Sequence, residues 1–339
     1  MNIGITYNLK DDVSPGAILD NEFCEEFDTG GTIDALIHVF EKNGHNSVKL
    51  GSGIKIVDKI RSEKVDFVFN IAEGYSGRNR ESGIPSILEM INVPYSGSDP
   101  LTLGMTLDKI VAKKIASQAG IPTPRYKVVK SIDELPSVEN KLWYPLIVKP
   151  AWEGSSKGIY NSSRVSTNAE LKESVGLLLG RYRNQPVLIE EYIEGREITV
   201  GVIGNARPQI IGTMEIMNKA DFSEDFFYSL EVKRDWKNLV SYVSPPRLNP
   251  ILERAIRHCA ISAFKEFGCR DVARIDFRVS KHGRIFMLEV NPLPGLSPEY
   301  ADLVIMAKKN GIQYNELVSA ILNHALSRYE KSGSVAKTI

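Results

Sequence analysis

The sequence RIDFRVSKHGRIFMLEVNPLPGLS, residues 274–297, predicts two β-strands joined by a Lys-His-Gly turn. The strands are expected over 273–279 and 284–290, and both are rich in apolar, β-branched and aromatic residues. The glycine stands where a tight hairpin needs a residue that tolerates unusual backbone angles. This part of the chain is therefore expected to form a β-hairpin.

Three polar side chains on this hairpin form a candidate metal site. Asp276 lies on the first strand, while Glu289 and Asn291 close the second and, two residues apart, share one face. Oxygen ligands that converge from adjacent strands suit a hard cation such as Mg²⁺. The alternative is an exposed hairpin with ordinary surface acids. The apolar neighbours of these acids favour the metal site, because a buried carboxylate is costly unless a cation or hydrogen bonds compensate.

The N-terminal part of the chain alternates strands with helices. Strands are expected over 3–7, 48–50 and 65–70, and helices over 32–42 and 54–63. This order is typical of a small doubly wound α/β domain with a parallel sheet. Ligands meet such sheets at the carboxyl ends of the strands, which draws attention to Glu73, Arg78, Arg80 and Glu81 in the segment after the third strand. A solvated loop would suit these charges equally well.

Two further stretches have the composition of functional loops. KPAWEGSSKGI at 149–159 contains glycines and serines flanked by Lys149 and Lys157, and backbone N–H groups in such loops can cradle phosphate. It lacks the GxxxxGK[ST] pattern, and an ordinary Gly-Ser turn is an equal alternative. Residues 216–238 are polar and aromatic without periodicity, and so long a segment in a compact domain is usually functional, often a lid.

Periodicity and breaker residues predict the remaining elements. Strands are expected over 126–129, 146–149, 186–192, 196–203 and 208–215. Helices are expected from a cap at Ser82 to about 91 and over 107–117, 168–180, 251–267, 300–307 and 314–329. VPYSGSDP at 93–100 is expected to form a strand and a turn.

Composition argues against several classes of protein. The 42 Lys and Arg residues balance the 42 Asp and Glu residues, so nothing favours a nucleic-acid or anionic-membrane surface. Three widely spaced cysteines match neither a disulfide framework nor a zinc pattern. No apolar run has the length of a membrane span or the flanks of a signal peptide. A cytoplasmic protein of two or three domains is expected.

Four motifs occur together and in order. They are PYSGSDP followed by LDK (94–109), IVKPAWEGSSKGI (147–159), VLIEEYIEGREITV (187–200), and RIDF followed by LEVNPLPG (274–295). Over nearly the whole chain they resemble the ATP-grasp superfamily and, within it, the D-alanine–D-alanine ligase family. The resemblance implies an α/β (α+β) ATP-grasp fold with a doubly wound preATP-grasp domain at 1–98. A central subdomain at 99–192, a C-terminal subdomain at 193–330 and a tail at 331–339 would follow.

The resemblance implies that ATP phosphorylates a carboxylate and that an amine then attacks the acyl phosphate. The cofactors would be ATP and two Mg²⁺ or Mn²⁺ ions, with Asp276, Glu289 and Asn291 as the metal ligands. The substrates would be an amino acid or related carboxylate and an amine, and the family expectation is a homodimer through the N-terminal domain. The nucleotide-binding residues would be Lys109, Lys149, Glu153, Ser155, Ser156, Glu190, Glu191, Tyr192, Ile193, Glu197 and Lys233.

The resemblance also assigns catalytic roles and shows where this chain departs from the family. Glu25 would hold the amino group of the first substrate, Ser155 matches the active-site serine, and Arg274 and the Gly295 amide would stabilise an oxyanion. The departures lie in the amino-acid half. They are Glu73-Gly74 for His-Gly, Tyr300-Ala301 for Ser-Leu, and Arg234 for a tyrosine that contacts a serine and a glutamate.

We therefore expect an ATP-dependent carboxylate–amine ligase with a divergent amino-acid site. Arg78, Arg80 and Arg234, with Tyr300, are candidate substrate residues, and the arginines suggest a substrate with an extra carboxylate or phosphate. Surface ion pairs or contacts with ATP phosphates are the alternative for these arginines. The alternative functions are a genuine D-alanine–D-alanine ligase of peptidoglycan synthesis, a carboxylase-like or kinase-like ATP-grasp enzyme, and a non-catalytic ATP-binding module.

Overall fold

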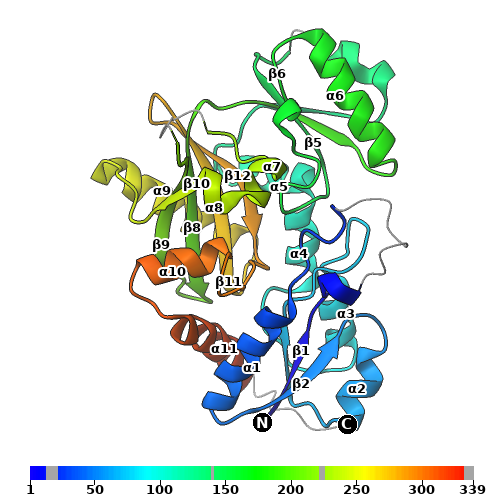
Figure 1. The fold of residues 1–339 in the computed structure, drawn as a ribbon, viewed down its shortest axis with the longest axis vertical. Helices are drawn as coiled ribbons and strands as arrows, with labels where there is room; N and C mark the ends of the chain where they lie inside the picture. Colours follow the sequence, from blue (N-terminus) through cyan, green and yellow to red (C-terminus); the bar gives the residue numbers. More distant parts are fainter. Residues whose placement is uncertain (13–21, 139–140, 221–225, 332–339) are drawn as a thin grey trace.

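The computed structural model describes residues 1–12, 22–138, 141–220 and 226–331, and its strands form three sheets (Figure 1). The predicted tail, 331–339, lies outside the described residues except for residue 331, as do residues 221–225 of the predicted lid. The domain boundaries at 98 and 192 stay predictions. Within the described ranges, no helix combines the length and apolar character needed to cross a membrane.

The N-terminal sheet is parallel and covered on both faces, which confirms the doubly wound prediction. Its order is β2-β1-β3, and alternate side chains face opposite layers. Ile5 and Phe69 pack with α1, whereas Val68 packs with α2 and α3. The elements are β1 (Asn2–Thr6), α1 (Gly30–Lys42), β2 (Asn46–Gly51), α2 (Ile56–Ser62), β3 (Phe67–Asn70) and α3 (Gly83–Met90).

The central sheet is antiparallel, in the order β4-β7-β5-β6, and α6 packs against it in a core of its own. This layer stands apart at the top of Figure 1, and the loop that leaves β5 hangs from it towards the other two sheets. The elements are β4 (Tyr126–Val129), β5 (Leu146–Pro150), β6 (Arg164–Val165), α6 (Asn168–Arg181) and β7 (Val187–Glu191).

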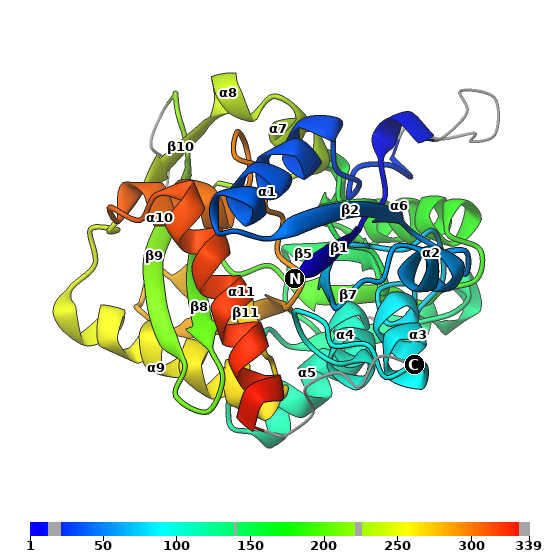
Figure 2. The same ribbon diagram turned by 90° about the horizontal axis from the view of Figure 1, so that it is seen from below.

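The largest sheet has the order β10-β9-β8-β11-β12 and includes the predicted hairpin. One face packs on α5 and α9 (Figure 2). On the other face, Ile211 of β9 and Val272 of β11 pack with α10 and α11. The strands are β8 (Gly195–Gly204), β9 (Gln209–Asn218), β10 (Val240–Val243), β11 (Asp271–Ser280) and β12 (Ile285–Asn291). The helices are α5 (Lys109–Gln118), α9 (Pro250–Glu266), α10 (Asp302–Lys309) and α11 (Tyr314–Lys331).

Alternation along these strands separates core from cavity. Ile275 and Phe277 of β11 are fully buried in the core, as is Val200 of β8. Arg274 and Asp276, which alternate with these two residues along β11, therefore lie on the opposite face. The same two-residue period that predicts the strands from sequence thus decides which side chains can reach a ligand.

The structure differs locally from the predictions. Residues 100–107, which lack a periodic apolar stripe, form α4 (Pro100–Leu107), started by the Asp99 side chain and by a proline in its first turn. Ser82 stands at the start of α3, but its hydroxyl donates to Pro100 O rather than capping the helix. The expected strand at 93–100 is reduced to one bridge at Tyr95. The predicted lid contains two short helices, α7 (Leu230–Arg234) and α8 (Trp236–Leu239).

One buried carboxylate joins the N-terminal layer, β11 and the C-terminal helix. Asp271 is fully buried with a φ of 64°, a conformation that aspartate and asparagine tolerate better than most residues. It accepts from Gly97 N at 2.8 Å and from Asn205 Nδ2 at 3.1 Å. Arg328 of α11 donates to both of its oxygens, at 2.9 and 2.7 Å. These contacts compensate the buried charge.

Asp271→Ala should destabilise the protein by about 3–5 kcal/mol, because it removes a fully buried carboxylate and leaves the partly buried Arg328 guanidinium without its charged partner. Asp271→Asn should cost less, since it keeps the backbone preference and part of the hydrogen bonding. Urea unfolding measures both. Glu253→Gln, which removes a surface pair with Arg257 on α9, is the control and should change stability by no more than about 0.5 kcal/mol. Equal effects of Asp271→Ala and the control would contradict the assignment.

Candidate functional site

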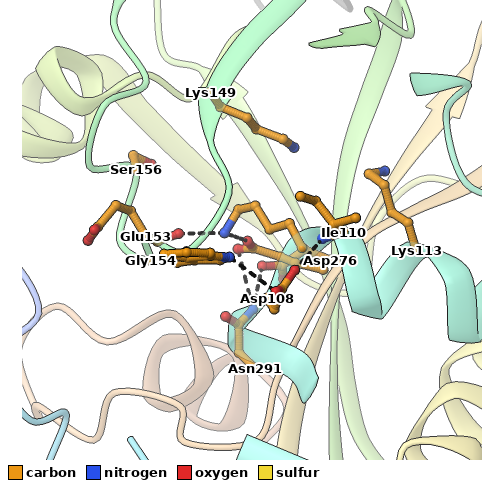
Figure 3. Close-up of polar contacts among 12 residues, drawn as sticks. Asp108, Ile110, Lys113, Lys149, Glu153, Gly154, Ser156, Asp276 and Asn291 are labelled. Carbon is orange, nitrogen blue, oxygen red and sulfur yellow. Dashed lines mark hydrogen bonds and ion pairs between the residues drawn. The ribbon is translucent and has the colours of Figure 1, made fainter. Parts of the chain in front are cut away.

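The three sheets meet at a cavity of ≈ 270 Å³. Four predicted residues, Glu153, Arg78, Arg80 and Arg234, are absent from its lining. All the other predicted residues line it: Glu25, Lys109, Lys149, Ser155, Ser156, Glu190, Glu191, Tyr192, Ile193, Glu197, Lys233, Arg274, Asp276, Glu289, Asn291, Gly295 and Tyr300. Figure 3 shows the part where the loop after β5 approaches Asp276 and Asn291.

The β11–β12 hairpin brings the three predicted metal ligands together. Asp276 lies directly opposite Glu289 in the ladder, and Asn291 lies opposite Arg274. The register shifts immediately after Asp276, and such a bulge re-aims side chains beside it. Asn291 Nδ2 is 3.0 Å from Asp276 Oδ2 and 3.5 Å from Glu289 Oε1. One amide and two carboxylates thus share one face, which is a donor set suited to a hard cation.

The charges around these ligands are unequal. Burial alone would raise the pKa of Glu289, but Lys109, Arg274 and Lys149 outweigh it and lower that pKa to about 2. Glu289 is therefore charged at all ordinary pH values. Burial raises the pKa of Asp276, although Arg274 opposes this with an ion pair of 2.9 Å. A cation bound between the two carboxylates would relieve this cost of burial.

The loop after β5 has the backbone of an anion-binding site. Ser155 and Ser156 have φ values of 51° and 60°, and Gly158 has 72°, so left-handed residues cluster where the sequence predicts a phosphate loop. Successive backbone N–H groups in such turns can form a concave nest for anions. Lys109 Nζ donates to Glu153 O, which places a positive charge beside the same loop. The geometry fits a phosphate-binding role.

Glu26 anchors this loop to the N-terminal segment. Its carboxylate accepts from Gly154 N at 2.9 Å, from Lys157 at 2.8 Å and from Arg80 at 2.8 and 3.0 Å. Burial would raise the pKa of Glu26, but Arg80 and Lys157 lower it to about 2. Arg80 also donates to Trp152 O at 2.6 Å. Sequence reasoning missed Glu26 as an anchor, and its only signal is its position next to Glu25.

Two buried lysines contact the side chain of Glu190 on β7. Lys113 and Lys149 hold the two oxygens of Glu190 at 2.5 and 2.7 Å (Figure 3 shows both lysines). Sequence reasoning missed Lys113, whose signal is its place one helical turn after Lys109, on the buried face of α5 with Ala116. Because two lysine side chains occupy the Glu190 carboxylate, residue 190 offers a ligand mainly its backbone.

Arg278 is a second residue that sequence reasoning missed. It is buried and donates to Ile193 O at 3.0 Å, to Tyr192 Oη at 2.6 Å and to Glu197 at 3.1 Å. Its signal is a charge two residues after Asp276, on the same face of β11. Burial raises the pKa of Glu197 to about 7 although Arg278 opposes the shift. Arg278 thus fixes the segment 192–197 as one wall of the cavity.

The described part of the predicted lid covers the loop after β5. Ser156 Oγ donates to Tyr228 O at 3.3 Å, and Leu230 N donates to Ile159 O at 2.8 Å. Arg234 of α7 binds Glu25: its Nε donates to Oε1 at 2.7 Å, and its Nη2 lies 2.6 Å from the same oxygen. Lid and N-terminal segment are therefore joined by an ion pair.

The three arginines do not meet in the cavity. Arg78 pairs with Asp108 and lies over the Trp152 ring at 5.9 Å, while Arg80 and Arg234 pair with Glu26 and Glu25. Each arginine thus positions a segment of the wall. These contacts favour the ion-pair alternative over a substrate with an extra anionic group. Tyr300 does line the cavity, as predicted.

The end of the cavity that is formed by N-terminal residues of the chain is rich in acidic side chains. Asp28, Glu73 and Glu81 line it beside Glu25 and Glu26. Burial raises the pKa of Glu73 well above its ordinary value, and the nearby Glu81, Glu26 and Asp28 raise it further. Burial also raises the pKa of Glu81 to about 7 and that of Asp28 to about 6. This end of the cavity carries several carboxyl groups at close quarters.

Comparisons with known proteins agree with this geometry. The family model described as D-ala D-ala ligase C-terminus matches residues 115–323. The D-alanine–D-alanine ligase of Carboxydothermus hydrogenoformans is 33% identical over 310 residues, which cover 88% of this chain and 94% of that protein. An uncharacterized protein, y4sG, of Sinorhizobium fredii is 35% identical over 271 residues, or 78% of this chain and 76% of that one.

Two solved structures share the fold. The D-alanine–D-alanine ligase from Bacillus anthracis complexed with ATP has a TM-score of 0.73 and 24% identity, and the match covers 98% of this chain and 100% of that one. VanG D-Ala:D-Ser ligase from Enterococcus faecalis has a TM-score of 0.72 and 23% identity, with 96% and 99% covered. Both likenesses confirm the predicted α/β architecture, with a parallel N-terminal sheet and antiparallel grasp sheets.

The raised pKa of Glu81 has a consequence for stability. Between pH 4.5 and about 7 the folded state keeps a proton on Glu81 that the unfolded state has lost, so stability falls as pH rises through this window. Glu81→Gln removes the effect and should make the protein more stable than wild type at pH 8, by up to roughly 3 kcal/mol. At pH 4 the two should be nearly equal. Urea unfolding at both pH values measures this. An unchanged difference between the proteins at the two pH values, or the same change in the exposed control Glu41→Gln, would contradict it.

Proposed function

The chain belongs to the D-alanine–D-alanine ligase family of ATP-grasp enzymes, which are ADP-forming amide ligases, and from this premise we propose that it joins an amino-acid carboxylate to an amine through an acyl phosphate. We propose further that its substrates differ from two D-alanines. The observation that carries the proposal is the contrast within one cavity. The metal and phosphate half has the family's residues, whereas Glu73 and Tyr300 in the lining depart from them, as does Arg234, which pairs with the lining residue Glu25.

We assign the divalent cation to Asp276, Glu289 and Asn291. The donor set fits Mg²⁺ because all three side chains supply oxygen and lie on one face of the hairpin. When bound, Mg²⁺ would neutralise charge on the transferring phosphoryl group and hold the phosphates in line. The B. anthracis relative was solved as a complex with ATP, which supports ATP as the nucleotide here.

The rest of the nucleotide half supplies positioning and charge. The loop with Ser155 and Ser156 offers backbone N–H groups to phosphate oxygens, and Lys109 and Lys149 add positive charge beside it. The backbone of 190–193 would contact the base, because the Glu190 carboxylate is held by two lysines. Glu197 would accept from the ribose hydroxyls. We also propose the remaining predicted nucleotide contacts, which are Glu153, Glu191, Tyr192, Ile193 and Lys233.

The proposed reaction has two chemical steps. A substrate carboxylate oxygen attacks the γ-phosphorus, and ADP leaves. The amine then attacks the acyl carbon, and the C–O bond to phosphate breaks as the amide forms. Arg274 and the Gly295 amide lie in the cavity beside the metal set and would stabilise the oxyanion of the tetrahedral intermediate. Glu25 would hold the α-ammonium of the first substrate through Oε2, since Arg234 occupies Oε1.

A genuine D-alanine–D-alanine ligase is the second candidate, favoured by the 33% identity to such an enzyme. A non-catalytic module is disfavoured, because a protein that only binds ATP has little use for Arg274 and the whole metal set. Phosphate release with ATP and Mg²⁺ across D-amino acids, L-amino acids and acidic amines separates these functions. Stimulation by D-alanine alone would overturn the divergent-substrate proposal.

Glu289→Ala and Asn291→Ala should each lower kcat for phosphate release by about a hundredfold or more, because the divalent cation would lose a ligand. The measurement is amino-acid-dependent phosphate release at saturating ATP over a range of Mg²⁺ concentrations. Glu41→Ala, on the exposed face of α1, is the control and should keep wild-type rates. Full activity in both metal-site variants would place the metal elsewhere.

The Glu25–Arg234 pair predicts coupling between lid and N-terminal segment. Arg234→Ala should raise KM for ATP severalfold, since the lid loses its link. In a double-mutant cycle with Glu25→Ala, the two changes should be non-additive by about 1 kcal/mol in kcat/KM, which is the order expected for a half-exposed ion pair. Lys237→Ala on α8 is the matched control in the lid. Additive effects of the two changes would mean that the pair does not act in turnover.

A further inference from the structure

The acids at the N-terminal end of the cavity outnumber the cations that face them. Glu26 is neutralised by Arg80 and Lys157, and Glu25 by Arg234. Glu73 and Glu81 have no hydrogen-bond or ion-pair partner among the residues that the structure describes. Two carboxyl groups therefore line this end of the cavity without a direct partner.

Glu81 is the more informative of the two. It is only 8% exposed, yet it lines the cavity, and its carboxyl is left without a partner in the described chain. A buried carboxyl without a partner costs stability, and a cation bound in the cavity would compensate this cost. Burial raises the pKa values of Glu73 and Glu81, although Arg80 opposes the rise at both and Lys109 and Lys157 oppose it at Glu81.

The missing partner is a cation of a particular kind. In the described ranges, no group of three or more His, Cys, Asp or Glu side chains is placed to hold a metal ion. One α-ammonium can be held by Glu25 Oε2, because the Arg234 contacts of 2.7 and 2.6 Å are both made to Oε1. Glu73 and Glu81 then remain for a second positive charge.

We propose that the first substrate is a dicationic amino acid, whose second amine or guanidine is held by Glu73 and Glu81. This inference rests on the ligase function proposed above and names its substrate class. The family histidine after the third strand is replaced by Glu73 in this chain, which converts a neutral or positive position into an acidic one. The arrangement would select for the second charge and leave the chemistry at the carboxylate unchanged.

The first test uses the wild-type enzyme with ATP and Mg²⁺ and measures phosphate release. The matched substrates are 2,4-diaminobutyrate and its neutral analogue 2-aminopentanoate, each as D and L isomers, with alanine for reference. We expect kcat/KM for one isomer of the diamino acid to exceed that of the neutral analogue by about tenfold or more, the size of one charge-assisted hydrogen bond. Equal or higher kcat/KM for the neutral analogue would overturn the inference and leave the ligase function standing.

The second test assigns the preference to the two carboxyl groups. Glu73→Gln and Glu81→Gln should each remove most of the preference, measured as the ratio of kcat/KM for 2,4-diaminobutyrate to kcat/KM for 2-aminopentanoate. Glu41→Gln is the control. A preference retained in both variants would overturn the assignment. If the wild-type protein released no phosphate with any amino acid, this result would instead contradict the proposed function itself.

A direct binding measurement does not depend on the variants. Calorimetry of wild-type protein with ADP and Mg²⁺, in two buffers of different ionisation enthalpy at pH 7, counts the protons released on binding. We expect 2,4-diaminobutyrate to release protons from the protein and 2-aminopentanoate to release fewer, because a second ammonium favours the ionised carboxyls. Equal proton release for the two ligands would contradict the inference even if a variant failed to fold.

Discussion

The pairing of β11 with β12 is the constraint on which the site depends. Ile275 and Phe277 are buried in the core, and this burial fixes Arg274 and Asp276 on the opposite face. A slip of one residue would turn every side chain of the hairpin to the other face. The energy of the core thus holds Asp276 opposite Glu289, where two carboxylates share a small space.

The segments that close over this hairpin are joined to one another by charge. Glu26 binds the loop after β5, and Arg234 brings the lid to Glu25. Buried ion pairs add little net stability, because desolvation offsets most of the attraction. Their effect is specificity, since each carboxylate is satisfied only when its segment lies in one position. The cavity is therefore bounded by loops whose place depends on partners from distant parts of the chain.

The sequence allows the elements with strong periodicity to be predicted. The N-terminal parallel sheet, the hairpin and the three metal-ligand candidates follow from alternation and spacing, without long-range information. Helix α4 was missed, because Pro100–Leu107 has no apolar stripe and is recognised by its cap instead. The roles of Glu26 and Lys113 were also missed, since each depends on a partner far along the chain. Lys157 is 131 residues from Glu26, and no local pattern encodes that contact.

The arginines show the same limit from the other side. Arg78 and Arg80 were recognised as notable charges, but their partners, Asp108 and Glu26, could be found only in the folded chain. With those partners in place, the side chains that line the cavity around Glu73 and Glu81 are acidic rather than basic. The motif residues that line the cavity could be named from the sequence. The sign of the charge around the proposed substrate residues could be found only from the structure.

Transfer of oxygen from the substrate tests the central claim most directly. With an amino-acid substrate whose carboxylate is labelled with ¹⁸O, ligation through an acyl phosphate transfers one labelled oxygen to the released phosphate for each amide formed. Mass spectrometry of phosphate and product measures this ratio. We predict one ¹⁸O in phosphate per amide. Unlabelled phosphate, released by attack of water on ATP, would contradict the account.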